Sequence, residues 1–265
     1  MNEKITVLNF DNTYQKQAFL HKENVDWVDL QSIANTNLFC ERATLKTIEH
    51  KISHLRNNIT LIGNGNYHYI TYLLLKQVQK PFTLILFDHH TDTLKSPSED
   101  LISCGSWVLE SLETNPYLQK VLIIGVSEEG ETQIPPSIEG KVRLYTKHHL
   151  RLNFKRALHS INQEIQTDEV YLSIDKDVLD KKDAITAWDH GNMRLRELLR
   201  VVKEIIKNKN ISGIDICGEY PSNSDEFGLE TKEANDKNSF ANRFMLEYII
   251  RWLRQANHSS EVLHA

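Results

Sequence analysis

Strand-like and helix-like segments alternate along this chain, and this alternation constrains the fold more than any other feature. Short runs of consecutive apolar residues indicate strands that are covered on both faces of a sheet. Amphipathic stretches lie between several of these runs and predict helices over 42–55, 69–80 and 195–208. The eight runs are ITVLNF (5–10), VDWVDL (25–30), ITLIG (59–63), FTLILF (82–87), KVLIIGV (120–126), KVRLYT (141–146), EVYLSID (169–175) and ISGIDIC (211–217).

Strands that alternate with helices predict parallel βαβ units with right-handed crossovers. The expected fold class is α/β, with about eight strands in a mostly parallel sheet that is either open and doubly wound or closed into a barrel. Ligand sites in both architectures lie at the carboxyl ends of the strands. No internal repeat or Pro/Gly/Ser-rich linker interrupts the 265 residues, so we expect a single domain over 1–265.

Composition and charge exclude several classes of partner. The net charge of −5 provides no electrostatic attraction to nucleic acid or to an anionic membrane. No apolar run approaches the roughly 18 residues that span a bilayer, and the N-terminus lacks a signal-peptide pattern. The three cysteines are widely separated and form no CxxC pair, so we expect reduced thiols, a cytoplasmic protein and no zinc site built from thiolates.

The predicted last helix, over 238–255, carries aromatic residues at four-residue spacing. They are Phe240, Phe244, Tyr248 and Trp252. Packing of this stripe onto the sheet is the expected explanation, and a homo-oligomer interface is the alternative.

The segment FDHHTDT (87–93) places three metal-ligating residue types at every second position after a buried strand: Asp88, His90 and Asp92. Alternation along an extended chain turns these three side chains to one side, while His89 points away. Burying three polar groups without partners is costly, and a cation removes that cost. The alternative for this segment alone is a solvated turn with Asp92 as a helix cap.

Two further strand ends carry similar residues. In YLSIDKDVLD (171–180), an apolar strand ends in Asp175 and Asp177, two positions apart, and Asp180 follows them. His68 follows the glycines of LIGNGNYHY (61–69). A dinucleotide-binding loop is the rival interpretation of that last segment, but His68 occupies the place of the third glycine.

Charge balance predicts how many ions these six residues bind. His68 and His90 are neutral ligands, and the four aspartates carry four negative charges, which two divalent ions neutralise. Carboxylate and imidazole ligands without sulfur suit Mn²⁺ or Fe²⁺, with Zn²⁺, Co²⁺ and Ni²⁺ as other possibilities. Two neighbouring ions lower the pKa of a shared water, so the implied reaction class is metal-assisted hydrolysis.

These segments resemble the motifs of the ureohydrolase superfamily, which comprises arginases, agmatinases and formimidoylglutamases. FDHHTD resembles its Asp-x-His-x-Asp motif, LSIDKDVLD its Ser-x-Asp-x-Asp-x-x-Asp motif, and GNYHY (65–69) its Gly-Gly-Asp-His-Ser segment. The resemblance implies a three-layer α/β/α fold and two Mn²⁺ ions per chain. It also implies hydrolysis of a guanidino or formimino C–N bond by a metal-bridging hydroxide, with release of urea or a related product.

The resemblance further assigns the ligands. His68, Asp88, Asp92 and Asp175 would bind one ion. The other ion would be bound by His90, Asp88, Asp175 and Asp177, so that Asp88 and Asp175 bridge the pair. Asp177 is therefore predicted to be essential for catalysis.

The segments that bind substrate in arginases differ in this chain. LISCGSWV (101–108) lacks a histidine, and Leu94 stands where arginases place an asparagine. In GIDICGEYP (213–221), Gly218 stands where the superfamily carries a guanidinium-binding glutamate, and Glu219 follows it. A one-residue shift changes the face of a strand unless a bulge corrects it.

Several residues are nevertheless candidates for contact with the substrate. Glu219 is the candidate substrate carboxylate, and a salt-bridged or solvated edge residue is the alternative for it. Trp107 of CGSW is a candidate binding residue. In AWDHGNM (187–193), Trp188 and Asp189 are candidates for the lining of the pocket. His190 is the candidate for the missing proton shuttle, and an ordinary loop histidine is the alternative.

The expected substrate is a small molecule or a peptide that carries a guanidino or formimino group, rather than plain free arginine. Two alternatives remain open from the sequence. One is a mononuclear zinc deacetylase-like amidohydrolase, which would leave Asp92 and Asp177 unexplained. The other is a catalytically silent binding or regulatory protein with a ureohydrolase-like fold.

Overall fold

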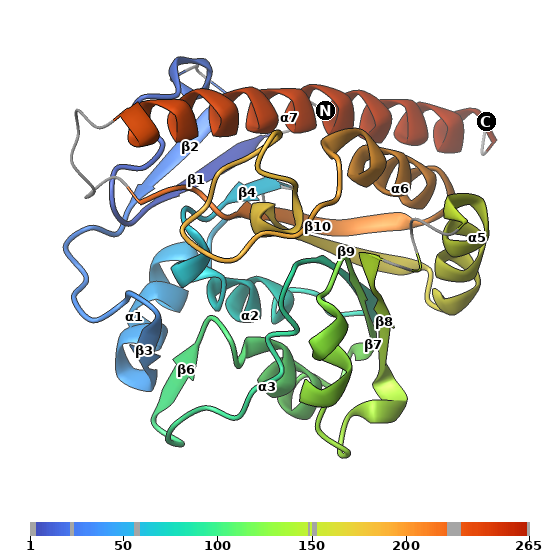
Figure 1. The fold of residues 1–265 in the computed structure, drawn as a ribbon, viewed down its shortest axis with the longest axis horizontal. Helices are drawn as coiled ribbons and strands as arrows, with labels where there is room; N and C mark the ends of the chain where they lie inside the picture. The colour runs from blue at the N-terminus through green and yellow to red at the C-terminus, as the bar shows by residue number, and fades with distance from the viewer. Residues whose placement is uncertain are drawn as a thin grey trace.

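A central sheet of eight strands organises the protein (Figure 1). The computed structural model describes residues 4–21, 24–55, 59–147, 149, 153–221 and 229–263. The strands of this sheet are Ile5–Asn9 (β1), Val25–Asp29 (β2), Ile59–Leu61 (β4), Phe82–Phe87 (β5), Leu118–Ile124 (β7), Val142–Tyr145 (β8), Glu169–Asp175 (β9) and Asn210–Cys217 (β10). All eight predicted strands are confirmed, with ends that differ by up to two residues.

The strand order decides between the two predicted architectures. It is β2-β1-β4-β10-β9-β5-β7-β8, and every pair of neighbours is parallel. The edge strands β2 and β8 each have a single neighbour, so the sheet is open rather than closed into a barrel.

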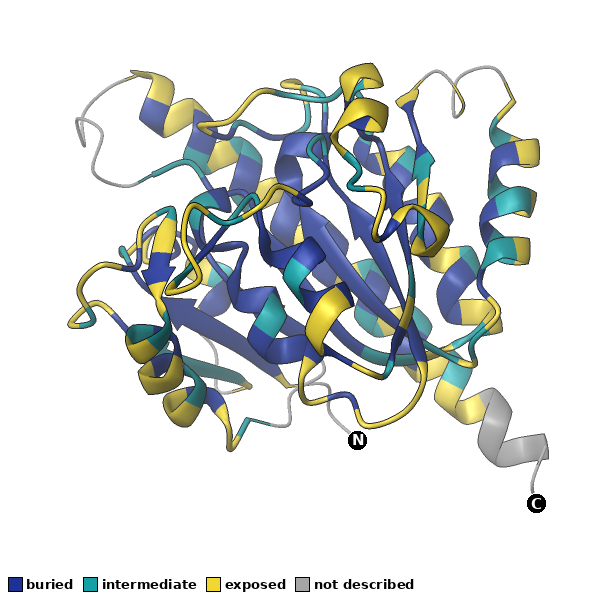
Figure 2. Cartoon of the chain, turned by 90° about the horizontal axis from the view of Figure 1, so that it is seen from below, coloured by how far each residue is buried: buried dark blue, intermediate teal, exposed yellow. Residues whose placement is uncertain are grey.

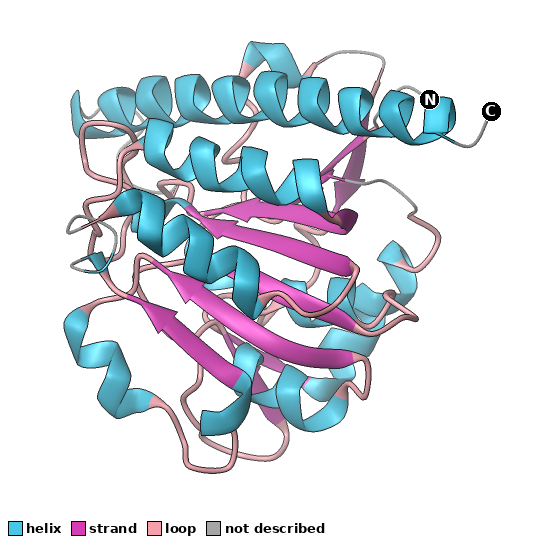
Figure 3. Ribbon diagram, turned by 90° about the vertical axis from the view of Figure 1, so that its right-hand side faces the viewer, coloured by secondary structure: helices cyan, strands magenta, loops and turns pink. Residues whose placement is uncertain are grey.

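Helices cover both faces of the sheet, as Figure 3 shows. On one face lie Arg42–Ile52 (α1), Ile70–Leu75 (α2) and Trp107–Thr114 (α3), and on the other lie Phe154–Glu164 (α5), Leu195–Asn208 (α6) and Leu229–Leu263 (α7).

The apolar run of β5 is continuous because both faces of this strand are buried. Leu84 and Leu86 join the core under α1, α2 and α3, whereas Ile85 and Phe87 join the core under α5, α6 and α7. All six residues of β5 are buried as a result, and Figure 2 shows the buried strands between the helical layers.

Helix lengths are where the sequence expectation and the structure differ. Helix α6 matches its predicted range, but α1 ends at Ile52 and α2 ends at Leu75. After Leu75 the backbone continues in tighter turns, because Gln77 N and Val78 N donate to carbonyls three residues back. A small antiparallel pair, Phe39–Glu41 (β3) with Leu101–Ser103 (β6), was not expected, since three-residue strands have no distinctive pattern.

The aromatic stripe of α7 lies beside the buried face of the helix rather than on it. Ala241, Met245 and Ile249 are buried, whereas Phe240 is 54% exposed. The four aromatic rings contact one another in sequence, with centroid separations of 5.6, 4.7 and 5.4 Å. The other three aromatic side chains are half-buried against the core between the sheet and α5, α6 and α7: Phe244, Tyr248 and Trp252. Packing onto the sheet therefore explains the stripe only in part.

The sheet order brings the polar strand ends together. Strands β4, β10, β9 and β5 are neighbours, and parallel strands all end at the same edge. Asp175 pairs with Cys217 of β10, and Ile174 pairs with Phe87 of β5, so Asp88 emerges beside Asp175. Among the described residues, no helix is both long and apolar enough to cross a membrane.

Candidate metal centre

A cavity of about 430 Å³ opens at the carboxyl edge of the sheet, and all six predicted metal ligands line it. They are His68, Asp88, His90, Asp92, Asp175 and Asp177. All are buried except His90, which is partly exposed toward the cavity. The arrangement follows from the topology, because three of the neighbouring strands β4, β9 and β5 each lead directly into one of the three motifs.

The first group of donor atoms surrounds His68. Its Nδ1 lies 3.3 Å from Asp88 Oδ2, 3.2 Å from Asp92 Oδ2 and 3.5 Å from Asp175 Oδ2. Ligands that share one divalent ion at bond lengths of about 2.1 Å approach one another to roughly 3.0–3.5 Å. Each of the three carboxylate oxygens therefore lies at a distance from His68 Nδ1 that two ligands of one ion adopt. Asp88 and Asp92 form one donor group with His68, and Asp175 belongs to another.

The second group surrounds His90 and shares a residue with the first. His90 Nδ1 lies 2.9 Å from Asp177 Oδ2 and 3.5 Å from Asp88 Oδ1. Asp88 thus presents one carboxylate oxygen to each histidine, which is the position of a bridging ligand. Asp175 belongs to the His68 side only, because the second donor group comprises Asp88, His90 and Asp177. Its Oδ1 accepts a hydrogen bond of 2.9 Å from the backbone N–H of Asp177.

The loop after β5 holds its ligands through its own backbone. His90 N–H donates to Asp88 Oδ1 at 2.7 Å, and His89 N–H donates to Asp177 Oδ1 at 3.0 Å. Asp92 has a φ of +52°, a left-handed conformation that non-glycine residues adopt at a cost of about 1–3 kcal/mol and that is concentrated at functional sites.

Trp107, in the first turn of α3, forms a hydrogen bond with the Asp92 carboxylate. Its indole N–H donates to Asp92 Oδ2 at 2.6 Å, and the side chain is fully buried. Trp107 was predicted to bind substrate. The structure instead places it behind a ligand, where it orients the Asp92 carboxylate.

A second layer of hydrogen bonds fixes the orientation of His68. The Ser173 hydroxyl donates its single proton to Asp215 Oδ1 at 2.7 Å, and it lies 2.9 Å from His68 Nε2. Because that proton is committed to Asp215, Ser173 accepts from His68 Nε2–H. The lone pair of Nδ1 is then left to face the carboxylates, as metal ligation requires.

The electrostatics of the protein alone favour a bound cation. Burial raises the pKa of Asp92 to about 6, and burial together with repulsion from neighbouring carboxylates raises the pKa values of Asp175 and Asp177. Burial opposes protonation of His90, but its hydrogen bonds to Asp177 and Asp88 outweigh this effect and raise its pKa to about 12. The buried carboxylates thus depend on positive charge, and their donor set of oxygen and imidazole nitrogen fits two divalent ions.

Two glycines allow the backbone to approach the ligands closely. A Cβ on Gly65 would lie 3.0 Å from Asp175 Oδ2 and 3.1 Å from a ring carbon of Trp188. Gly218 has a φ of +85°, and a Cβ there would lie 2.4 Å from Asp175 Oδ1. Any side chain at position 218 would therefore clash with Asp175, so a glutamate does not fit there.

The loop residues predicted to contact substrate lie in different environments. Trp188 lines the cavity, with its ring edge-on to His90 at 5.6 Å and its indole N–H donating to Asn66 Oδ1. Asp189 is exposed to solvent and does not line the cavity. His190 Nδ1 donates to Leu179 O at 3.0 Å and its Nε2 accepts from Thr186 N–H at 3.1 Å, so both ring nitrogens pin the loop.

The Glu219 side chain does not line the cavity, where it was predicted to lie. It is 1% exposed and forms an ion pair with Lys176, whose side chain is also fully buried. Glu219 also accepts hydrogen bonds from Gln17 Nε2 at 3.1 Å and Asn242 Nδ2 at 2.6 Å. The shift by one residue from Gly218 thus turns this carboxylate into the link between β10, α7 and the N-terminal loop.

The wall of the cavity contains residues that the sequence did not single out. Leu38, Phe39 and Pro97 are apolar, and Lys95 and Gln133 are polar. Leu94, which stands where arginases place an asparagine, also lines the wall, and so does Cys104 of LISCGSWV. No local sequence pattern predicts these residues, because they come from loops and from the short β3–β6 pair.

Comparisons with known proteins identify relatives of this chain. Residues 3–236 match the model of the arginase family. An uncharacterized protein of Thermotoga maritima is 32% identical over 216 residues, which is 81% of this chain and 79% of that protein. An agmatinase of Chromobacterium violaceum is 24% identical over 192 residues, which is 66% of this chain but only 55% of the agmatinase.

Solved structures share the architecture. Formimidoylglutamase from Bacillus subtilis superposes with a TM-score of 0.69 at 18% identity, covering 94% of this chain and 86% of that chain. At such low identity the likeness concerns the fold alone, and it confirms the predicted α/β arrangement with an eight-stranded parallel sheet.

Removing the hydroxyl of Ser173 is expected to weaken metal binding. Ser173→Ala frees His68 Nε2–H from its acceptor, and loss of such an outer hydrogen bond typically lowers metal affinity by about 10- to 100-fold. Chelator competition with Mn²⁺ measures the effect. Ser212→Ala, in the same sheet but bonded to Glu169 away from the cavity, serves as the matched control and should bind normally. Equal affinities of the two variants would contradict the orienting role of Ser173.

Breaking the buried ion pair is expected to destabilise the fold. Glu219→Gln leaves the Lys176 ammonium buried without an ionised partner, which costs about 3–5 kcal/mol. The double variant Lys176→Met/Glu219→Gln should recover much of this loss. Urea unfolding of both variants and of Glu233→Gln, which removes an exposed ion pair, provides the comparison. A single variant as stable as the wild type would show that the pair does not hold β10.

Proposed function

Because this chain belongs to the arginase family, as the motif resemblance predicted, we propose that it is a metal-dependent hydrolase with a binuclear centre. Its substrate would carry a guanidino or formimino group, and hydrolysis of a C–N bond in that group would release urea or a related product. Mn²⁺ is the ion that the oxygen-rich donor set suits, and Fe²⁺, Co²⁺, Ni²⁺ and Zn²⁺ are also compatible with it.

One observation carries this proposal: Asp88 divides its two oxygens between the His68 group and the His90 group. A centre for a single ion would leave one of these two groups of buried side chains without a metal ion to bind. This observation favours two ions over the mononuclear deacetylase-like alternative. When bound, two divalent ions polarise the substrate and lower the pKa of a coordinated water molecule.

The protein's own residues would bind and orient the substrate. Trp188, Leu38, Phe39 and Leu94 give the cavity an apolar wall against which the carbon chain of a substrate can pack. Asp177 holds the His90 side of the centre through Oδ2, and its Oδ1 is fixed by His89 N–H. We assign no proton transfer to His190 or Glu219, because hydrogen bonds and the ion pair described above engage both.

The wall also supports a substrate other than plain free arginine. Leu94 and Cys104 occupy the segments that bind the amino-acid end of arginine in arginases, and neither offers the polar contacts needed there. A cavity of about 430 Å³ holds a small molecule or a single side chain of a peptide.

Product release from a panel of guanidino and formimino compounds tests the proposal. The protein loaded with Mn²⁺ should release urea or ammonia from at least one of them. Asp177→Ala removes a ligand and should lower kcat/KM by at least roughly 10²-fold. Asp29→Ala, an exposed aspartate on the edge strand β2, is the control and should keep full activity.

Two outcomes would contradict the proposed function. The first is full turnover by Asp177→Ala. The second is a protein that holds two ions per chain and hydrolyses none of the compounds, which would favour a catalytically silent binding protein.

A further inference from the structure

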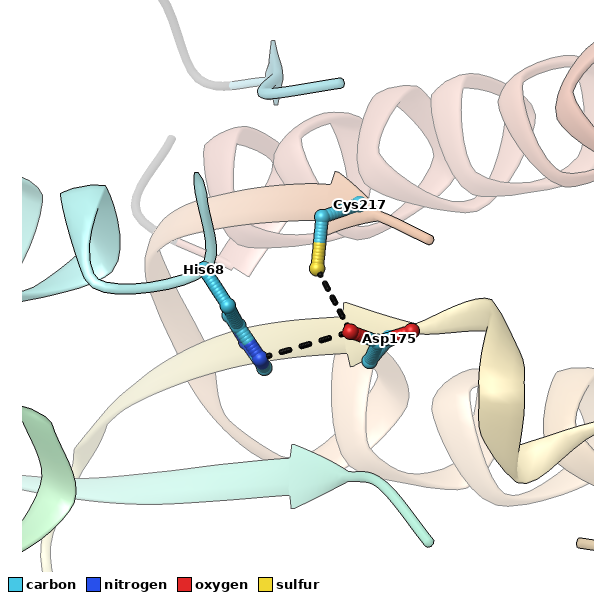
Figure 4. A group of neighbouring side chains, drawn as sticks. All are labelled: His68, Asp175 and Cys217. Carbon is cyan, nitrogen blue, oxygen red and sulfur yellow. Dashed lines mark hydrogen bonds and ion pairs between the residues drawn. The ribbon is translucent and has the colours of Figure 1, made fainter. Parts of the chain in front are cut away.

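A third group of donor atoms lies beside His68, and it includes a thiol (Figure 4). Cys217 Sγ lies 3.1 Å from Asp175 Oδ2, the same oxygen that lies 3.5 Å from His68 Nδ1. Donor atoms of His68, Asp175 and Cys217 all lie within 4.8 Å of one another. All three side chains are buried, and Cys217 is fully buried.

The strand geometry explains why this thiol faces the metal centre. Cys217 is the last residue of β10 and pairs directly with Asp175 of β9. Alternation along β10 places Asp215 and Cys217 on the face of His68, while Ile216 enters the opposite core. Asp215 reaches His68 through Ser173, and Cys217 reaches the ligand oxygen directly. The turn at Gly218 and the anchored Glu219 end the strand at this point.

The distances match those of two ligands on one ion. A metal–sulfur bond of about 2.3 Å and a metal–oxygen bond of about 2.1 Å place the two ligand atoms about 3.1–3.6 Å apart, for bond angles between 90° and the tetrahedral value. The distance from Cys217 Sγ to Asp175 Oδ2 lies in this range. An ion held by His68 and Asp175 is therefore within reach of the sulfur after small side-chain movements.

We propose that Cys217 is a sulfur ligand of the ion held by His68 and Asp175, and that it makes this position select softer divalent ions. Thiolate favours Zn²⁺, Co²⁺ or Fe²⁺ over Mn²⁺, whereas the His90 position keeps oxygen and nitrogen ligands only. Coordination replaces the thiol proton with the metal ion, and the proton is released to solvent. The proposal rests on the proposed function only in that it requires the metal centre.

The absorption of the cobalt-loaded protein tests this ligand directly. Thiolate bound to Co²⁺ produces sulfur-to-metal charge-transfer absorption in the near ultraviolet, which oxygen and nitrogen ligands do not. The chain has three cysteines, so the variant Cys40→Ser/Cys104→Ser leaves Cys217 alone. We expect this variant to show the absorption and Cys217→Ser to lack it.

Metal competition provides a second readout. Removing the sulfur should lower the preference for Zn²⁺ over Mn²⁺ at one of the two positions by at least roughly tenfold. Cys104→Ser, which alters a cavity-wall thiol outside the donor group, is the matched control and should keep the wild-type preference.

The outcomes separate this proposal from the proposed function. Binding of two Co²⁺ ions without sulfur absorption, in the wild type and in Cys40→Ser/Cys104→Ser, would overturn the role of Cys217 and leave the binuclear centre intact. The same holds if the preference for Zn²⁺ is unchanged in Cys217→Ser. Absence of any bound Co²⁺ would instead contradict the metal centre itself, whichever cysteines are present.

Discussion

Repulsion among four buried carboxylates is the constraint on which the rest of this structure depends. Asp88, Asp92, Asp175 and Asp177 share one end of the sheet with two histidines and little access to solvent. Ionised carboxylates in such a place are stable only beside positive charge. The raised pKa values of Asp92, Asp175 and Asp177 express the same constraint. The proposed pair of divalent cations would resolve it, because their charge equals in magnitude that of the four carboxylates.

The surrounding structure holds these groups in place against their repulsion. Backbone N–H groups fix Asp88, Asp175 and Asp177, and the Trp107 indole fixes Asp92. His68 is oriented by Ser173 and Asp215. Behind the ligands, the buried pair of Lys176 and Glu219 ties the end of β9 to the end of β10. A site prepared in this way needs little rearrangement when it binds metal.

The sequence predicts those features that depend on short-range periodicity. Continuous apolar runs give the eight strands, and two-residue spacing gives Asp88, His90 and Asp92 on one side of the chain. Parallel topology then brings distant strand ends to the same edge, so His68, Asp175 and Asp177 follow without knowledge of tertiary contacts.

Features that depend on tertiary contacts escape this reasoning. Trp107 lies behind Asp92 because α3 packs under the loop after β5. The Glu219 side chain lies outside the cavity because Lys176, in the middle of the second motif, provides a buried partner for its carboxylate. His190 is engaged by the backbone of its own loop, and the cavity wall comes from the β3–β6 region. Local pattern carries no information about such partners, so the substrate is less predictable than the metal centre.

The most direct measurement of the central claim is the number and position of metal ions in crystals grown with Mn²⁺, located by anomalous scattering. The account predicts two ions per chain, one beside His68 and one beside His90, with Asp88 bound to both. A single ion, or two ions that do not share Asp88, would contradict it.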